Sequence, residues 1–300
     1  MKRVLAIDVG GTKLATAIVS ADGAITAERR ASTPRTEDPE ELLASLIAIA
    51  KASVHEEGAP IDGIGVGCGG PMRWPEGIVS PLHIAAWRDF PLRERLAKAF
   101  GVPCAVDNDA KAFALGEHWL GAGRGARALL GVVVSTGVGA GIVIDGTLVH
   151  GAGGQAGHVG HVIADPDGPE CDCGAQGCVE AIASGDALAR RGGAAPEAIA
   201  ERARKGDAEA ERLYREAGRA LARGIASAAA LLDLDRVVIG GGVGLGAWDL
   251  LEAPLVAELG LRARLSFTRN LSVLRSELGQ HAGLLGAAKL ALDAGSEPWS

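Results

Sequence analysis

The sequence of 300 residues predicts an α/β fold in two lobes, and three observations support this prediction. Short aliphatic runs typical of buried strands alternate with amphipathic segments typical of helices. The length lies at the upper limit of what one hydrophobic core usually supports, about 250–300 residues. An aliphatic run, a glycine turn and a second aliphatic run open the chain, and the same pattern recurs at residues 129–144. Two unrelated hairpins in a glycine-rich chain would also give this repeat.

The individual elements follow from local pattern. Strands are predicted at the aliphatic runs 4–7, 14–19, 61–68, 104–106, 129–134, 141–144 and 236–239, with a further strand from Ile25. Asp22-Gly23 and Asp145-Gly146 are typical of hairpin turns. Helices are predicted from about Pro39, over 92–100, over 207–232 and after the region of Gly283, because apolar residues recur there at helical spacing. Most of the segment 151–180 is predicted to be loop.

Composition and charge exclude several classes of function. The chain has 30 Lys and Arg against 37 Asp and Glu, a net charge of −7, whereas binding a nucleic-acid backbone requires a basic face. No apolar run approaches the about 18 residues of a membrane span, and the first run meets Asp8 too early for a secretory signal. We therefore expect a cytoplasmic protein with no nucleic-acid or membrane partner.

Glycine-rich turns at three strand ends indicate a nucleotide site. With 44 glycines and only 3% aromatic residues, the chain favours loops in which backbone N–H groups approach phosphate oxygens. The candidate residues of the first turn are Asp8, Gly10, Gly11, Thr12 and Lys13. Asp8 is a candidate ligand for Mg²⁺. This turn lacks the Gly-Lys-Ser/Thr ending of a P-loop, so a plain tight hairpin is the alternative.

The second and third turns follow later strands. Thr136 and Gly137 lie in the second, where the threonine hydroxyl is placed to donate to a phosphate oxygen. The third is Gly240-Gly241-Gly242, which suits the close approach of the adenosine part of a nucleotide. A single such turn is weak evidence, but three together predict that the chain binds a nucleotide.

Asp107-Asn108-Asp109 follows a predicted strand and opens a predicted helix. Phosphoryl transfer to a hydroxyl needs a carboxylate that orients the hydroxyl and accepts its proton. Asn108 is a candidate hydrogen-bond partner for a polyol. The alternative is that one of these residues only caps the helix, since Asp and Asn are favoured there. Spacing alone does not choose between Asp107 and Asp109 as the base.

Three cysteines and a histidine predict a zinc site. His161, Cys171, Cys173 and Cys178 provide the four ligands of a closed tetrahedral Zn²⁺ site, which is typical of a structural metal. Cys171 and Cys173 are poorly placed for a mutual disulfide, and cytoplasmic thiols stay reduced. His150, His158 and Glu180 flank the cluster and are candidates for a ligand cleft instead of the metal.

Together these motifs resemble the ROK family (repressors, uncharacterised frames and sugar kinases) of the actin-like ATPase superfamily. The matching segments are Asp8-x-Gly10-Gly11-Thr12-Lys13, Asn108-Asp109-Ala110, Ser135-Thr136-Gly137-x-Gly139-x-Gly141, Gly160-His161 and Cys171-x-Cys173-Gly174-x-x-Gly177-Cys178-x-Glu180. The resemblance implies a two-lobed actin-like (ribonuclease H-like) fold with the zinc-bearing loop in the second lobe. Its expected lobes are 1–118 plus 289–300, and 119–288.

The resemblance also implies a function. It is ATP-dependent phosphorylation of a hexose, of glucose type and on the 6-hydroxyl, by a homodimer that uses Mg²⁺. Asp109 corresponds to the general base, Asn108 and Glu180 to sugar contacts, and His161 to a zinc ligand that borders the sugar. Gly69 and Gly70 occupy the place of a loop lining the sugar site.

One residue departs from the family pattern. The usual Gly-Glu-x-Gly-His is here Gly157-His158-Val159-Gly160-His161, so a charged acceptor near the anomeric end of the sugar is replaced by an imidazole. A change of this kind alters substrate choice, because an unpaired buried hydroxyl is costly. An N-acyl hexosamine or a cyclitol is therefore the alternative substrate.

The family also contains sugar-responsive repressors. These carry a DNA-binding domain before the kinase-like part, whereas here the first strand is predicted from Val4. A non-catalytic sugar sensor is the second alternative to a kinase.

Overall fold

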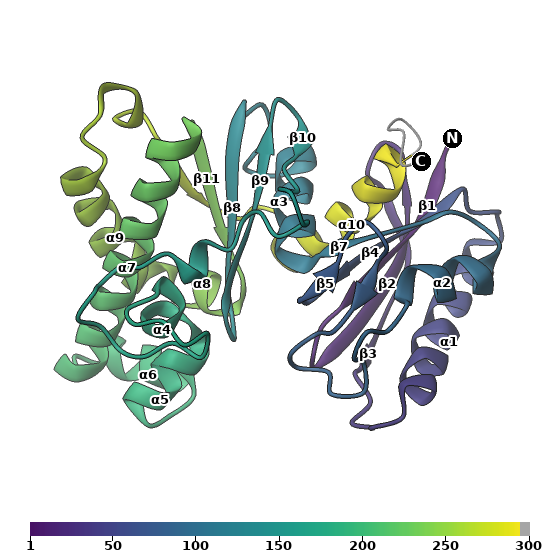
Figure 1. The fold of residues 1–300 in the computed structure, drawn as a ribbon, viewed down its shortest axis with the longest axis horizontal. Coiled ribbons are helices and arrows are strands. Elements are labelled where there is room, and N and C mark those ends of the chain that lie inside the picture. The colour runs from purple at the N-terminus through teal and green to yellow at the C-terminus, as the bar shows by residue number, and fades with distance from the viewer. Residues whose placement is uncertain (295–300) are drawn as a thin grey trace. The chain divides into compact units, whose positions relative to one another are not determined.

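The computed structural model describes residues 1–294, which fall into two compact units (Figure 1). The first unit contains residues 1–120, 150–156 and the chain from Gln280 onward, and the second contains 121–149 and 157–279. This division differs from the expected lobes, because the first unit takes in the whole C-terminal helix and a short segment at 150–156. Of the expected portion 289–300, residues 295–300 lie outside the described residues.

The first unit is built on a five-stranded sheet of order β3-β2-β1-β4-β7. The strands are β1 (Arg3–Val9), β2 (Lys13–Ser20), β3 (Ile25–Ser32), β4 (Gly63–Cys68) and β7 (Cys104–Asn108). The first three pair antiparallel, and β4 and β7 continue from β1 in parallel. Two short antiparallel strands, β5 (Met72–Arg73) and β6 (Ile78–Val79), lie in the loop after β4.

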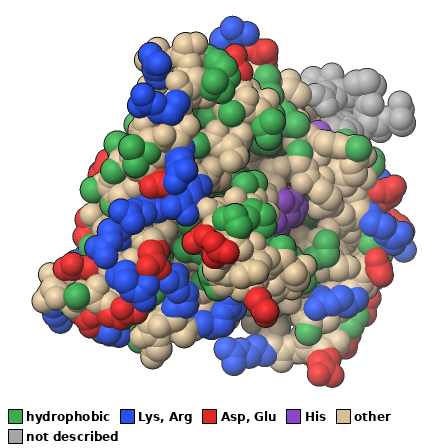
Figure 2. Space-filling model, turned by 60° about the vertical axis from the view of Figure 1, so that its left-hand side comes forward, with side chains coloured by type: hydrophobic (Ala, Val, Ile, Leu, Met, Phe, Trp, Pro, Cys, Tyr) green, Lys and Arg blue, Asp and Glu red, His purple; other side chains and the backbone are tan. Residues whose placement is uncertain are grey.

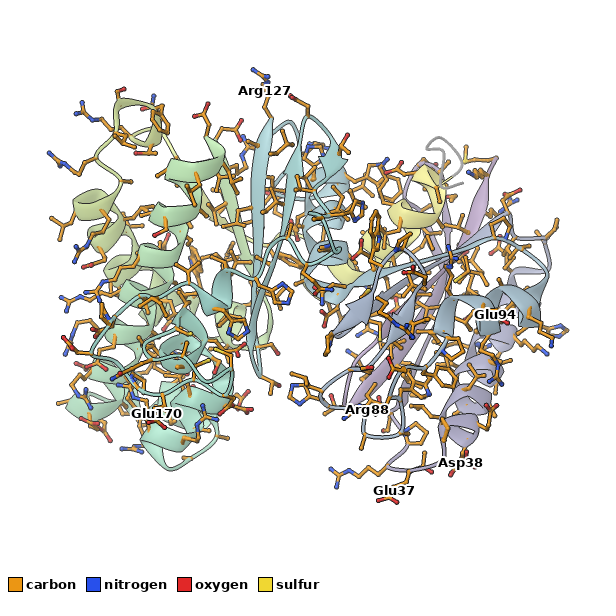
Figure 3. The ribbon with its side chains drawn as sticks, viewed as in Figure 1. Glu37, Asp38, Arg88, Glu94, Arg127 and Glu170 are labelled. Atoms are coloured by element: carbon orange, nitrogen blue, oxygen red, sulfur yellow. The ribbon has the colours of Figure 1, made fainter. Side chains whose placement is uncertain are left out.

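Helices pack against this sheet. They are α1 (Pro39–Glu57), α2 (Leu92–Phe100), α3 (Asp109–Leu120) and α10 (Ala282–Asp293). Asp38 caps α1 by accepting the N–H of Glu40, and it lies at the start of that helix in Figure 3. Alternate residues of the central strands form one core with the apolar face of α1, which buries Leu42 and Leu46.

The other residues of β4 face α3 and α10, and here glycine allows close packing. A β carbon on residue 65 would lie 1.7 Å from the carbonyl oxygen of Ala287 in α10. A β carbon on Gly286 would lie 1.6 Å from the carbonyl oxygen of Ala112 in α3. Part of the high glycine content therefore serves helix packing and not phosphate binding.

The second unit repeats the strand order of the first. Its sheet has the order β10-β9-β8-β11-β12, in which β10, β9 and β8 pair antiparallel and β11 and β12 continue from β8 in parallel. The strands are β8 (Ala128–Val134), β9 (Val138–Ile144), β10 (Thr147–Leu148), β11 (Arg236–Gly240) and β12 (Ser272–Arg275). The two glycine hairpins, β1–β2 and β8–β9, thus hold equivalent places, which contradicts the alternative of unrelated hairpins.

The helices of the second unit follow the loop that carries Cys171, Cys173 and Cys178. They are α4 (Val179–Ala183), α5 (Gly185–Gly192), α6 (Pro196–Arg204), α7 (Ala208–Leu232), α8 (Gly242–Gly246) and α9 (Trp248–Arg262). The long helix α7 packs along α9, as Figure 1 shows. Buried Tyr214 in α7 donates its hydroxyl to the carbonyl of Pro196, which joins α7 to α6.

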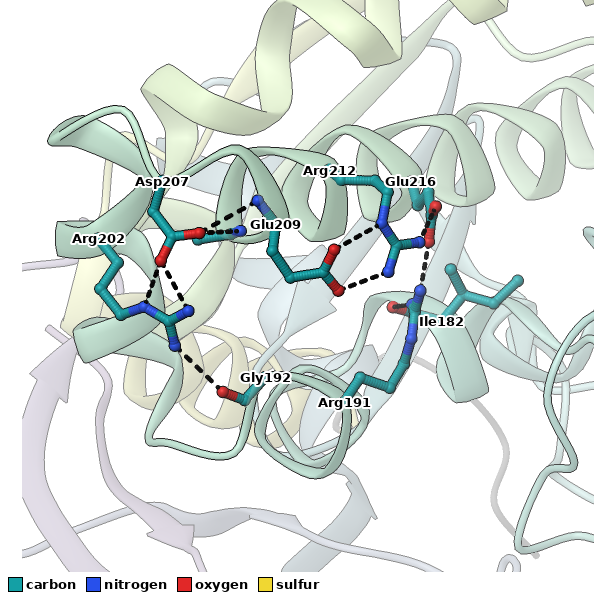
Figure 4. Close-up of polar contacts among 9 residues, drawn as sticks. Ile182, Arg191, Gly192, Arg202, Asp207, Glu209, Arg212 and Glu216 are labelled. Carbon is teal, nitrogen blue, oxygen red and sulfur yellow. Dashed lines mark hydrogen bonds and ion pairs between the residues drawn. The ribbon is translucent and has the colours of Figure 1, made fainter.

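Ion pairs connect the surface helices of the second unit. Arg191 pairs with Glu216 and donates to the carbonyl of Ile182, which ties α5 to both α4 and α7 (Figure 4). Glu216 also accepts from Arg212 at 2.5 Å. On the face drawn in Figure 2, basic and acidic side chains are interspersed, in keeping with the ion pairs. No helix within residues 1–294 is both long enough and apolar enough to cross a membrane.

Candidate active site

The structure divides the predicted site residues between the two units. The first unit holds Asp8, Gly10, Gly11, Thr12, Lys13, Gly69, Gly70, Asn108 and Asp109. The second holds Thr136, Gly137, His158, His161, Cys171, Cys173, Cys178, Glu180, Gly240, Gly241 and Gly242.

In the first unit, Asn108 ends β7 and Asp109 begins α3. The side chains of both accept a hydrogen bond from the N–H of Ala110, at 3.0 and 2.9 Å. The capping role that the sequence offered as an alternative is thus present, and it fixes the directions of both side chains. Asp109 remains accessible to solvent but is recessed, and desolvation raises its pKa, against the opposing hydrogen bond from Ala110.

The two aspartates on either side of Asn108 have different surroundings. Asp107 is buried, with Nζ of Lys111 at 3.3 Å from Oδ1 and Nδ1 of His150 at 3.0 Å from Oδ2. A buried carboxylate with both oxygens against these partners is shielded from any substrate. The geometry therefore leaves Asp109, and not Asp107, free to meet a substrate hydroxyl.

The loop after β4 lies beside this junction. A β carbon on Gly70 would lie 3.7 Å from Nδ2 of Asn108, so the Gly69-Gly70 loop and the amide of Asn108 are neighbours. The structure thus brings four of the predicted sugar-site residues together in the first unit: Gly69, Gly70, Asn108 and Asp109.

Asp8 lies at the end of β1, against the start of α10. A β carbon on Gly283 would be 3.1 Å from Oδ2 of Asp8. The pKa of Asp8 is raised to about 6, with desolvation as the main cause and the charge of Asp109 as the second, against the opposing charges of Lys13 and Arg30. Two carboxylates close enough to repel each other are a donor set that fits Mg²⁺, because a divalent cation relieves the repulsion.

The glycine turn between β1 and β2 is held by its own backbone. The N–H of Gly10 donates to the carbonyl of Lys13 at 2.9 Å, and the hydroxyl of Thr33 donates to the carbonyl of Gly10 at 2.7 Å. A β carbon on Gly11 would lie 2.6 Å from Cβ of His83. Sequence reasoning missed His83, which opposes the upward shift in the pKa of Asp109, because nothing in its local pattern distinguishes it from a surface histidine.

In the second unit the four predicted zinc ligands meet. The ligand atoms of His161, Cys171, Cys173 and Cys178 all lie within 4.8 Å of one another. Sγ of Cys173 lies 3.8 Å from Sγ of Cys178, and Sγ of Cys171 lies 3.8 Å from Nδ1 of His161. Zinc-bound sulfurs at about 2.3 Å from the metal stand about 3.8 Å apart in a tetrahedron, so the residues fit Zn²⁺.

The zinc cluster places His161 and Glu180. Because Nδ1 of His161 faces the cluster, Nε2 is directed away from it and lies 3.9 Å from Oε1 of Glu180. Oε2 of Glu180 accepts the N–H of Val138 at 2.8 Å. The ring of His158 stacks on that of His161, with centroids 6.1 Å apart. His158, His161 and Glu180 are therefore one cluster of polar groups.

The two glycine turns of the second unit lie at the ends of neighbouring strands, β8 and β11. Gly241 has a φ of +87°, and a β carbon there would lie 2.3 Å from the carbonyl oxygen of Val134. Gly241 is thus required by packing against β8. Thr136 is exposed, and nothing lies within 4 Å of a β carbon placed on Gly242. Both positions are therefore accessible to a nucleotide.

Comparison with known proteins agrees with this geometry. Residues 4–294 match the model of the ROK family. The chain is 39% identical to the N-acetylmannosamine kinase of Escherichia fergusonii over 295 residues, which cover 96% of this chain and 97% of that protein.

Two solved structures have the same fold. The ROK hexokinase from Thermus thermophilus superposes with a TM-score of 0.87 at 35% identity, and the match covers 98% of this chain and 100% of the hexokinase chain. The ROK family glucokinase from Streptomyces griseus, in complex with glucose and AMPPNP, superposes with a TM-score of 0.82 at 32% identity, covering 97% and 99%.

Proposed function

Because this chain belongs to the ROK family and is an ATP-dependent sugar kinase, we propose that its substrate is an N-acyl hexosamine, phosphorylated on the 6-hydroxyl. The observation that carries this choice is the 39% identity, over 96% of the chain, to N-acetylmannosamine kinases. The glucose-bound relative is less similar, at 32%. The glucose-type substrate expected first from the sequence becomes the second candidate.

A residue of this chain, His158, supports the same choice of substrate independently of the comparison with relatives. It stacks on zinc-ligating His161 beside Glu180, where a charged acceptor is expected in glucose kinases of the family. An imidazole offers one donor and one acceptor in place of a carboxylate. A sugar that presents an amide near the anomeric end provides both partners, whereas the hydroxyl of glucose at that place loses a charged acceptor.

The residues of the first unit provide the chemistry. Asp109 accepts the proton of the 6-hydroxyl as that oxygen attacks the terminal phosphorus of ATP, and its raised pKa brings the base closer to neutral pH. The amide of Asn108, held by its capping bond, orients the sugar. Asp8 would hold Mg²⁺ together with the nucleotide, and the cation would supply positive charge to the phosphates.

The second unit provides the remaining sugar contacts and the turns that bind the nucleotide. The closed four-ligand zinc set has no open position, so the metal is structural and serves to fix His161 and Glu180 as sugar contacts. The turns at Thr136–Gly137 and Gly240–Gly242 bind the nucleotide. A homodimer is the remaining part of the proposal, and sedimentation velocity tests it.

The deciding experiment is ADP release measured across a sugar panel with the wild-type protein. N-acetylmannosamine, N-acetylglucosamine, mannose, glucose and a cyclitol are compared at equal ATP. We expect kcat/KM for an N-acyl hexosamine to exceed that for glucose by at least about tenfold, the scale of one lost polar contact. A preference for glucose would refute the hexosamine proposal and leave the kinase activity standing.

A further inference from the structure

A fully buried lysine lies behind the junction that carries Asn108 and Asp109. The side chain of Lys111 is 1% exposed, and its Nζ donates to the carbonyl of Gly154 at 2.6 Å and lies 3.3 Å from Oδ1 of buried Asp107. Lysine is almost never fully buried unless it is paired, because removing an ammonium group from water costs several kcal/mol. The ammonium group therefore stays in place only while both partners are held.

The second oxygen of Asp107 faces another chain segment. Nδ1 of His150 lies 3.0 Å from Oδ2, and the imidazole ring stacks on Trp74 with centroids 4.2 Å apart and planes at 18°. Asp107 is thus held from two sides, by Lys111 from α3 and by His150 from the segment 150–156.

The segment 150–156 also contacts the loop that follows β4. Gly154 has a φ of +75°, and a β carbon there would lie 2.3 Å from Cβ of Trp74, so only glycine fits. Nε2 of Gln155 donates to the carbonyl of Met72 at 2.9 Å. Met72 comes two residues after Gly70, which is itself beside the amide of Asn108. One segment therefore supports both pieces of chain that carry the sugar contacts proposed for the first unit.

We propose that Lys111 and His150 are positioning residues for sugar phosphorylation. By holding Asp107 and the segment 150–156, they fix Asn108 and Asp109 relative to the Gly69-Gly70 loop. The inference rests on the proposed function, since it takes Asp109 as the base and Asn108 as a sugar contact. Neither Lys111 nor His150 touches a substrate.

The kinetic test separates positioning from folding by using matched variants. Lys111→Met keeps the length of the side chain and removes the charge. For this variant we expect the sugar KM to rise and kcat to fall, each by at least about tenfold, while the ATP KM stays within twofold of wild type. Asp107→Asn with Lys111→Met leaves no uncompensated buried charge, so we expect its thermal midpoint to return toward wild type while the sugar KM stays raised. His150→Phe keeps the ring on Trp74 and removes the nitrogen that lies beside Oδ2 of Asp107, whereas His150→Asn keeps a nitrogen close to that oxygen and should recover part of the loss.

Amide hydrogen exchange provides a measurement that needs no turnover. Loss of Lys111 should speed exchange in peptides covering 105–112 and 150–156 by at least about tenfold, with peptides of the second unit unchanged.

The possible outcomes are distinguishable. If wild-type protein phosphorylates no sugar, the proposed function fails, and the exchange data alone decide whether Lys111 holds the segment 150–156 in place. If Lys111→Met does not fold, the same kinetic and exchange measurements are made on the double variant and on His150→Phe. Unchanged sugar KM and kcat in variants that fold, or unchanged exchange at 150–156, would overturn the proposal.

Discussion

The carboxylate of Glu180 lies directly against Gly137, where a β carbon on residue 137 would be 2.6 Å from Oε2. The same oxygen accepts the N–H of the next residue, Val138, at 2.8 Å. The turn between β8 and β9, predicted only as a phosphate loop, therefore also sets the position of a proposed sugar contact.

Gly137→Ala should weaken sugar binding, because the new methyl group must displace Glu180. We expect sugar KM to rise by at least about tenfold with zinc content unchanged, since the zinc ligands are not touched. Steady-state kinetics with metal analysis of the same preparation checks this. Gly260→Ala is the matched control, because nothing lies within 4 Å of its new methyl group. Equal sugar KM in the two variants would contradict the expectation.

Asp109→Asn should leave a folded, zinc-loaded protein whose kcat falls by at least about 100-fold, the scale of a general base. The amide keeps an oxygen that caps α3 but cannot accept the hydroxyl proton. Asp145→Asn, at an exposed turn where the aspartate pairs with Arg127, is the control and should keep wild-type kcat. Near-normal turnover by the Asp109→Asn variant would show that Asp109 is not the general base.

Asp8 should make stability depend on pH in a defined direction. Its pKa is about 6 in the folded protein against an ordinary 3.8, so folding favours the protonated form. The stabilisation from this group is fully present below about pH 4 and is lost as pH rises through about 6. Asp8→Asn removes the titration, so wild type should lose stability relative to that variant between pH 4 and 7. Urea unfolding without nucleotide or added magnesium measures the two profiles, and parallel profiles would contradict the shift.

Cys173→Ser should lower zinc content and thermal midpoint together, because a closed four-ligand site contributes directly to folding. Cys104→Ser is the control, since that thiol lies in β7, in the other unit. Elemental analysis and a melting curve on the same sample give both readouts. A wild-type preparation that contains no zinc, or a Cys173 variant that melts like wild type, would refute the metal assignment.

His158→Glu should move substrate preference toward glucose. A glutamate restores the charged acceptor near the anomeric end, and a charge-assisted hydrogen bond is worth roughly 1.5–3 kcal/mol, or about 10- to 150-fold in kcat/KM. The ratio of kcat/KM for glucose to that for N-acetylmannosamine should rise by an amount in this range. An unchanged rank order of sugars would show that His158 does not set specificity.

Local signals predicted the parts of the fold that local sequence determines. The hairpins at Asp22-Gly23 and Asp145-Gly146, the capped helix from Pro39 and the strand-to-helix junction at Asp109 all lie where the pattern indicated. The zinc ligands were predictable because metal coordination requires both the residue types and the spacing.

Contacts between distant segments were not predictable. Helix α9 and strand β12 had no assignment, because Pro254 inside α9 and the glycines before it obscure a helix that is packed along α7. The packing of Gly65 against α10 had no local signal, since its partner Ala287 lies more than 200 residues away in the sequence. Lys111 had a local signal in its spacing of four from Asp107, whereas nothing local indicated His150.

The route of the chain through the first unit has a consequence for biosynthesis. The strands β1 and β4 are made more than 200 residues before the helix α10, which packs on their glycine-lined face. While the intervening residues are made, the part of this surface that α10 covers has no partner, and exposed strand surfaces of that kind are prone to aggregate. Nascent chains should therefore need chaperone protection until α10 emerges, and stop codons placed before residue 282 should yield insoluble product.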